Sequence, residues 1–286
     1  MIQKKYLTMR IWKWLVIVLV LLVLCISIKL IFWKNITKDP SIDVRQRVQF
    51  QSIEAGLRAF RREFSEYPSS SATDPCGQPY CGAMKLCEAI VGRDLMGFHK
   101  DSVFRADGMD ASGTVQLYGD LTDIKHLSQT RRGPMVSPAT VSPTKLSDVY
   151  GIENTGPYPN DAVVCCDIYK SVSQTAHNDG MPVLYFIANG IVNTRDPYGL
   201  DKIYNPEDNR TLIELGVLDN PKEIHPLYSD QTPFINQLKI RLKSKYPGGR
   251  YHVAYILLSA GPDGLYGTED DDMFVKTLKQ KRPGYE

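Results

Sequence analysis

An apolar stretch near the N-terminus restricts the folding of this chain more than any other feature. Residues 14–28 contain no charged side chain, and with the flanking apolar residues the stretch covers residues 11–33. A helix of that length spans the roughly 30 Å hydrocarbon core of a bilayer. Lys13 and Lys29 lie near its ends, where their ammonium groups can reach the lipid headgroups. We therefore predict a transmembrane helix over residues 11–33, with a buried core helix as the alternative.

Charge is distributed unevenly on the two sides of this stretch. The first 38 residues hold seven basic and no acidic residues, whereas the rest holds 27 basic and 32 acidic residues. An acidic outer part does not favour nucleic acid, which needs a basic patch. The basic residues before the stretch predict a cytoplasmic tail over residues 1–10, with the chain after residue 40 translocated across the membrane. No small-residue cleavage site follows the stretch, so we expect an uncleaved anchor and a short linker over residues 34–42.

A second pattern lies near the C-terminus, where an apolar strand runs into a glycine-rich turn. The turn ends in four consecutive acids, Glu269–Asp272, and Asp263 adds a further carboxylate earlier in the loop. Carboxylate and carbonyl oxygens in a flexible loop are the ligands that calcium prefers. A solvated acidic loop is the alternative. The loop is not an EF-hand, because position 12 counted from Asp263 is Phe274 instead of Glu.

Apolar residues at helical spacing predict an amphipathic helix over residues 43–66, and Tyr67-Pro68 ends it. The apolar residues on which this prediction depends are Val44, Val48, Ile53, Leu57, Phe60 and Phe64. Two further helices are expected over residues 82–92 and 232–245.

Two strands are expected over residues 182–188 and 251–259, and Asn189-Gly190 predicts a turn after the first. Residues 93–180 are rich in Asp, Gly, Ser, Thr and Pro. We expect them to form a large irregular insertion with short strands and long loops.

The cysteines leave more than one interpretation open. One cysteine, Cys25, lies in the apolar stretch, and an odd number lies outside it. Cys76 and Cys81 could close a small loop, and the adjacent Cys165 and Cys166 could pair with members of the group Cys76, Cys81 and Cys87. A zinc site is the competing interpretation. The five outside the stretch are Cys76, Cys81, Cys87, Cys165 and Cys166.

Four common catalytic or nucleotide-binding motifs are absent from the sequence. There is no Gly-x-Ser-x-Gly, no His-Glu-x-x-His, no Walker loop and no Gly-x-Gly-x-x-Gly. Ser142-Pro-Thr-Lys145 matches Ser-x-x-Lys, but it lies in a Pro/Ser/Thr-rich stretch typical of a loop. The five histidines show no ligand spacing. We therefore expect no enzymatic activity, no catalytic residue and no small-molecule substrate.

Four segments, in this order, resemble those of type II secretion pseudopilins of the major, G-type kind, which belong to the pilin-fold family. The first is the apolar N-terminal helix, and the second is Glu54–Pro68, which resembles the family's helix end and its Tyr-Pro stop. The third is Gly82–Phe98. The fourth joins Pro182–Asn189 with Tyr255–Asp272, where Ser-Ala-Gly-Pro-Asp-Gly-Leu-Tyr-Gly-Thr-Glu-Asp-Asp is similar to the family's C-terminal calcium loop.

The resemblance implies an α+β, pilin-like fold. Its long N-terminal helix, with a transmembrane first half, would pack on a small antiparallel sheet in a domain of residues 43–286, with 93–180 as the variable insertion. It also implies a structural Ca²⁺ held by four carboxylates, with oxygens added by two further residues. The implied ligands are Asp263, Asp270, Asp271, Asp272, Ser259 and Leu265.

The implied function is that of a structural subunit of the cell envelope. The chain would be a single-pass protein of the bacterial inner membrane, with its C-terminal domain in the periplasm or outside the cell. Its partners would be the membrane, through residues 11–33, and other pseudopilins or further copies of itself.

The departures from the family pattern favour an alternative. Family members carry a leader ending in Gly and a Glu at the fifth position of the apolar segment. Here no Gly precedes Gly56 and no acid precedes Asp39, so the family's methylation motif is absent. The alternative is a membrane-anchored binding or adhesion module that keeps the pilin-like fold without assembling.

Overall fold

The computed structural model describes residues 40–119, 129–169, 180–193, 203–217, 223–245 and 250–278. The chain divides into two units, residues 1–44 and 45–286, and the fold given below is that of the second. The predicted tail, the predicted transmembrane helix and most of the predicted linker lie outside the described residues. No helix within the described ranges combines the length and the apolar character needed to cross a membrane.

The longest helix, α2, covers Pro40–Phe64 and includes 25 residues. Residues 40–42, which we had assigned to a linker, are its first turn. Pro40 suits that position because a proline there has a suitable φ and its missing N–H would be unpaired anyway. The helix ends before Ser65, whose φ of 68° is left-handed, and Tyr67-Pro68 follows.

The buried face of α2 differs from the predicted one in its first half. Val48 is 54% exposed, whereas Gln46 and Gln49 are buried. The Gln49 amide donates to the Cys166 carbonyl at 2.8 Å, and the Ile168 N–H donates to Gln46 Oε1 at 3.1 Å. Hydrogen bonds to the neighbouring loop therefore compensate for the burial of two amides.

A three-stranded antiparallel sheet forms the centre of the domain. It consists of β5 (Leu184–Asn193), β6 (Arg250–Ser259) and β7 (Asp272–Leu278), in the order β5-β6-β7. The predicted turn at Asn189-Gly190 is wrong, because β5 continues through it with a shift of register between Ile187 and Gly190. Strand β7 was not predicted.

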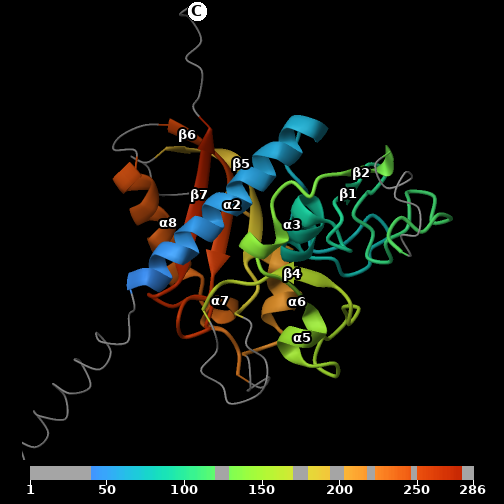
Figure 1. Ribbon diagram of the computed structural model, residues 1–286. Coiled ribbons are helices and arrows are strands. Elements are labelled where there is room, and N and C mark those ends of the chain that lie inside the picture. Colours follow the sequence, from blue (N-terminus) through green and yellow to red (C-terminus); the bar gives the residue numbers. More distant parts are fainter. Residues whose placement is uncertain are drawn as a thin grey trace, which may run out of the picture. The chain divides into compact units, whose positions relative to one another are not determined.

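Both faces of the sheet are covered. Figure 1 shows α2 running across the strands, and Tyr255 and Leu257 of β6 share a buried cluster with Ile53 and Leu57 of α2. Ile256 and Leu258, which point the other way because side chains alternate along a strand, belong to a second cluster. That cluster includes residues of α6 (Arg210–Ile213), α7 (Pro226–Ser229) and α8 (Thr232–Lys245). The 3₁₀ helix η3 (Pro206–Asn209) directly precedes α6.

The middle of the chain is organised around α3 (Gly82–Val91), which is buried along its whole length. It packs against β4 (Val163–Cys165), which pairs with β3 (Pro143–Lys145), and against β1 (Phe98–His99), which pairs with β2 (Arg131–Arg132). The 3₁₀ helix η1 (Pro138–Thr140) and α5 (Leu146–Tyr150) complete the described elements.

A buried carboxylate holds this middle region together. Glu88 of α3 is 2% exposed, and its two oxygens accept hydrogen bonds from the hydroxyls of Tyr80, Ser102 and Tyr118. These donors come from three separate places in the loops around α3. The predicted insertion is therefore irregular in secondary structure but is fixed to α3 by specific polar contacts.

Candidate metal centre in the loop between β6 and β7

In the loop from Ala260 to Asp271, two glycines lie where the backbone passes very close to another part of the chain. Gly261 has a φ of 68°, and a Cβ on it would lie 2.3 Å from the Asp270 carbonyl oxygen. Gly267 has a φ of 95°, and a Cβ there would lie 2.4 Å from the Leu227 nitrogen of α7. Only glycine fits these positions. The first contact closes the loop on itself, and the second seats it on α7.

Oxygen atoms gather around the hydroxyl of Thr268. Its Oγ1 lies 2.6 Å from Asp270 Oδ1, 3.3 Å from Asp271 Oδ1 and 3.3 Å from the Leu265 carbonyl oxygen. All three are acceptors, and a hydroxyl has a single proton to donate. The loop thus brings two carboxylates and a carbonyl closer together than its internal hydrogen bonds can fully satisfy.

Burial makes the carboxylates of this loop costly to ionise. Asp271 is buried, and burial raises its pKa to about 8 even though it accepts a hydrogen bond from the Gly267 N–H at 2.8 Å. Asp263 is more exposed, yet partial desolvation and, to a smaller extent, the neighbouring Asp270 carboxyl raise its pKa to about 6. The Leu265 N–H donates to Asp263 Oδ1 at 2.9 Å and opposes this shift.

Two of the predicted ligands point elsewhere. The Ser259 hydroxyl donates to Asp167 Oδ2 at 2.6 Å, and the Asp272 carboxylate accepts from the Tyr169 hydroxyl. Ser259 and Asp272 are direct partners across β6 and β7, so their side chains share a face of the sheet. Both side chains thus contact residues 167–169, and Ser259 Oγ also accepts a hydrogen bond from the Gly261 N–H at the start of the loop at 3.2 Å. Neither side chain is hydrogen-bonded to the oxygen cluster around Thr268.

Two residues near the loop were missed by the sequence reasoning. Thr268 is at the centre of the oxygen cluster, and its place directly before the acidic run was the available signal. Asp167 is 3% exposed, and burial raises its pKa to about 7. No pattern in the sequence connects Asp167 with Ser259, since 92 residues separate them.

The donor types of the loop fit calcium, but they are not arranged as a finished coordination shell. Within the described residues, no three side chains of His, Cys, Asp or Glu come together closely enough to hold a metal ion. Asp263, Asp270 and Asp271, with the Leu265 carbonyl and the Thr268 hydroxyl, are the residues that would supply hard oxygens after a small rearrangement. Four of the six predicted ligands therefore lie in the same loop cluster.

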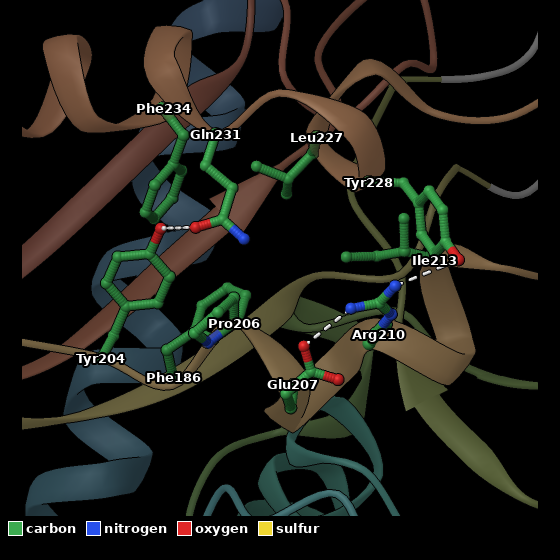
Figure 2. A pocket seen from close by; sticks show the side chains of 10 residues that line it. All are labelled: Phe186, Tyr204, Pro206, Glu207, Arg210, Ile213, Leu227, Tyr228, Gln231 and Phe234. Carbon is green, nitrogen blue, oxygen red and sulfur yellow. Dashed lines mark hydrogen bonds and ion pairs between the residues drawn. The ribbon is translucent and has the colours of Figure 1, made fainter. Parts of the chain in front are cut away.

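A small hollow lined partly by Phe234 of α8 is a weaker candidate. It lies between β5 and η3, α6, α7 and α8, and its volume of about 20 Å³ holds little more than one water molecule. Figure 2 shows that its polar side chains bind one another: Tyr204 donates to Gln231 at 3.2 Å, and Arg210 pairs with Glu207 at 2.8 Å. The hollow as it stands cannot enclose a substrate. Its lining residues are Phe186, Tyr204, Pro206, Glu207, Arg210, Ile213, Leu227, Tyr228, Gln231 and Phe234.

One arrangement resembles a nucleophile with its base. The buried Lys85 Nζ lies 2.6 Å from the hydroxyl oxygen of the exposed Ser71, and burial lowers the pKa of Lys85 to about 8. However, the same ammonium also donates to the carbonyls of Ser71 at 2.8 Å and Thr73 at 2.7 Å. Its three protons are thus all used, so this lysine fixes the loop before α3 and is not free to act as a base.

Searches with protein-family models, among curated proteins and among solved structures find no match for this chain.

Proposed function

We propose that this protein is a membrane-anchored, pilin-like structural subunit, similar to a type II secretion pseudopilin, whose C-terminal loop is stabilised by calcium. The observation that carries the proposal is the packing of α2 along an antiparallel sheet whose β6–β7 loop gathers carboxylates. A folded head that follows a predicted apolar anchor in the sequence suits a subunit that presents its head on a membrane surface.

The contact between α2 and the sheet supports a rigid connection within the head. Phe50 of α2 lies 6.2 Å from Phe274 of β7 between ring centroids, and Glu54 pairs with Lys276 at 2.5 Å. Both sheet partners belong to the strand that leaves the acidic loop. Order in that loop is therefore transmitted to the strand against which α2 packs.

Calcium would act by replacing protons in the loop. Without a cation, the carboxylates of this loop repel one another, and burial disfavours the charged forms of Asp263 and Asp271. A bound Ca²⁺ supplies two positive charges and accepts the oxygens that a single Thr268 proton cannot satisfy. An ion that binds only the folded head stabilises it by mass action.

A second candidate is a membrane-anchored binding or adhesion module that does not assemble. It is favoured by one specific observation, the lack of any acidic residue in the apolar stretch 11–33. In the family that this chain resembles, a Glu in that stretch neutralises the terminal amine of a neighbour during assembly. The two candidates differ in whether apolar stretches of different copies touch.

Cross-linking of the full chain in membranes distinguishes the two candidates. Cys25 lies in the apolar stretch, and Val23→Cys adds a second thiol on the opposite side of the predicted helix. An assembling subunit gives a ladder of covalent oligomers after oxidation, because each copy touches more than one neighbour. The exposed Cys76 is replaced by Ser throughout, and Cys25→Ser with Val23 intact is the control that gives no ladder.

A protein that stays monomeric under these conditions contradicts the assembly proposal and leaves the non-assembling module as the function.

A further inference from the structure

Two buried cysteines from distant parts of the chain meet behind α2. Cys87 of α3 and Cys165 of β4 are both fully buried free thiols, and they belong to the cluster that contains Ile53 and Leu57. Helix α3 packs directly on β4. The two thiols are in hydrogen-bond contact. The pKa of Cys87 is raised, mainly by burial and secondly by this contact with Cys165.

The alternation of side chains along the chain selects Cys165 over its neighbour. Cys165 lies in the cluster beneath α2, together with Cys87. Cys166 is buried in the other cluster, which also contains Cys81. Consecutive residues of an extended chain point to opposite sides. Of the two vicinal cysteines, Cys165 is therefore the one placed to bond with Cys87.

The structure does not favour the small loop closure between Cys76 and Cys81. Cys76 is exposed, and its sulfur lies 3.0 Å from Arg105 Nη1. The Cys81 thiol is buried and interacts with the Tyr158 hydroxyl. Each of these two sulfurs has a different neighbour, so the structure gives no support to a bond between them.

We propose that Cys87 and Cys165 form a disulfide that fastens α3 to β4 when the domain folds in an oxidising compartment. The oxidant is a reactive disulfide, either a small one such as oxidised glutathione or that of a disulfide-carrying oxidoreductase. One protein thiolate attacks this disulfide and releases one thiol; the second attacks the resulting mixed disulfide and releases the other. The two cysteines lose two protons and two electrons, and the reagent disulfide becomes two thiols.

The burial of both thiols sets the order of events. A thiol reacts as its thiolate. Burial raises the pKa of Cys87, and neither Cys87 nor Cys165 has exposed surface that a reagent could reach in the folded domain. The exchange therefore takes place while α3 is not yet packed on β4. The resulting bond closes a loop of about 80 residues, long enough to restrict the unfolded chain substantially.

Peptide mapping under non-reducing conditions tests the pair. The full chain in detergent is unfolded, then refolded with a glutathione redox buffer, alkylated and digested with trypsin. The expected product links the peptide Leu86–Arg93, which contains Cys87, to Leu146–Lys170, which contains the vicinal cysteines. Fragmentation between Cys165 and Cys166 identifies the bonded sulfur in the unmodified protein, so the result does not depend on any variant's folding.

Matched variants give an independent readout. Cys166→Ser is the control, because it is equally buried and adjacent, and it should keep the link. Cys165→Ser and Cys87→Ser should lose the link. Oxidation should raise the melting temperature of the wild type by about 10 °C relative to the reduced protein and leave that of Cys165→Ser unchanged.

A link through Cys166, or complete alkylation of Cys87 and Cys165 after oxidative refolding, overturns the proposal. The same holds if addition of the oxidant to the native protein forms the bond as fast as refolding does, because the thiols would then not be protected by packing.

Discussion

Asp271 has the largest pKa shift among the acids of the β6–β7 loop. Burial raises its pKa to about 8, whereas Asp263 reaches about 6. Since the ordinary pKa of aspartate is 3.8, the folded state binds a proton at Asp271 that the unfolded state has lost between about pH 4 and pH 8. Stability therefore falls as the pH rises through this window, unless a cation takes the place of the proton.

The fall of stability with rising pH gives a prediction for the protein without bound calcium. With a chelator present, the free energy of unfolding should fall between pH 7 and pH 8 by up to about 1.4 kcal/mol per pH unit, because one site contributes at most one proton. Asp271→Asn should remove most of this slope. Asp167, whose pKa burial raises to about 7, adds a contribution of the same sign mainly below this range.

Chemical denaturation at a series of pH values measures the slope. Glu269→Gln is the matched control, since Glu269 is in the same acidic run but is exposed. The buried His225 interferes little, because burial lowers its pKa in the folded state to about 4, and in the unfolded state its ordinary pKa of 6.5 leaves it mostly neutral above pH 7. A slope that survives Asp271→Asn would mean that Asp271 is ionised in the folded loop.

At the scale of elements, the phase of α2, meaning which of its side chains face the domain, determines what the helix contacts. Apolar spacing placed Val48 in the core, but the glutamines at 46 and 49 occupy the buried positions in the first half of the helix. Their amides reach the backbone of residues 166 and 168. The hydrophobic pattern does not reveal this, because the compensating hydrogen bonds come from a loop far away in the sequence.

Paired substitutions on α2 test this phase. Leu57 is fully buried between the helix and the sheet, so Leu57→Ala should lower the free energy of unfolding by about 3 kcal/mol through lost burial and a new cavity. Val48→Ala removes an exposed side chain and should change it by less than about 0.5 kcal/mol. Urea unfolding of the two variants compares these effects; a larger loss for Val48→Ala would contradict the observed phase.

The elements predicted from the sequence were those with strong local signals. The helices α2 and α8 and the strand β6 follow from apolar periodicity and flanking turn residues, and they lie close to the expected ranges. Strand β7 was missed because it starts within the acidic run, where charge suggested a loop. The side chains of Ser259 and Asp272 lie apart from the other predicted ligands because the register of β6 and β7, which no local pattern reveals, turns both toward residues 167–169.

On the scale of the whole molecule, the β6–β7 loop and strand β7 contact helices that lie far from them in the sequence. The β6–β7 loop rests on α7 and α8, through Gly267 near Leu227 and through a hydrogen bond of 3.0 Å from Gln237 to the Thr268 carbonyl. Strand β7 follows this loop directly and contacts α2 through Phe274 and Lys276. An ion in this loop would therefore stabilise the entire head.

Thermal unfolding of the full chain in detergent, with calcium and with a chelator, tests the ion-stabilised head most directly. At a calcium concentration about 100 times the dissociation constant, we predict a melting temperature about 5–10 °C above that of the chelated protein. Asp272→Asn, whose carboxylate points away from the loop, should keep this difference, and Asp270→Asn should abolish it. Equal melting temperatures for the wild type with calcium and with chelator would contradict the calcium-stabilised loop.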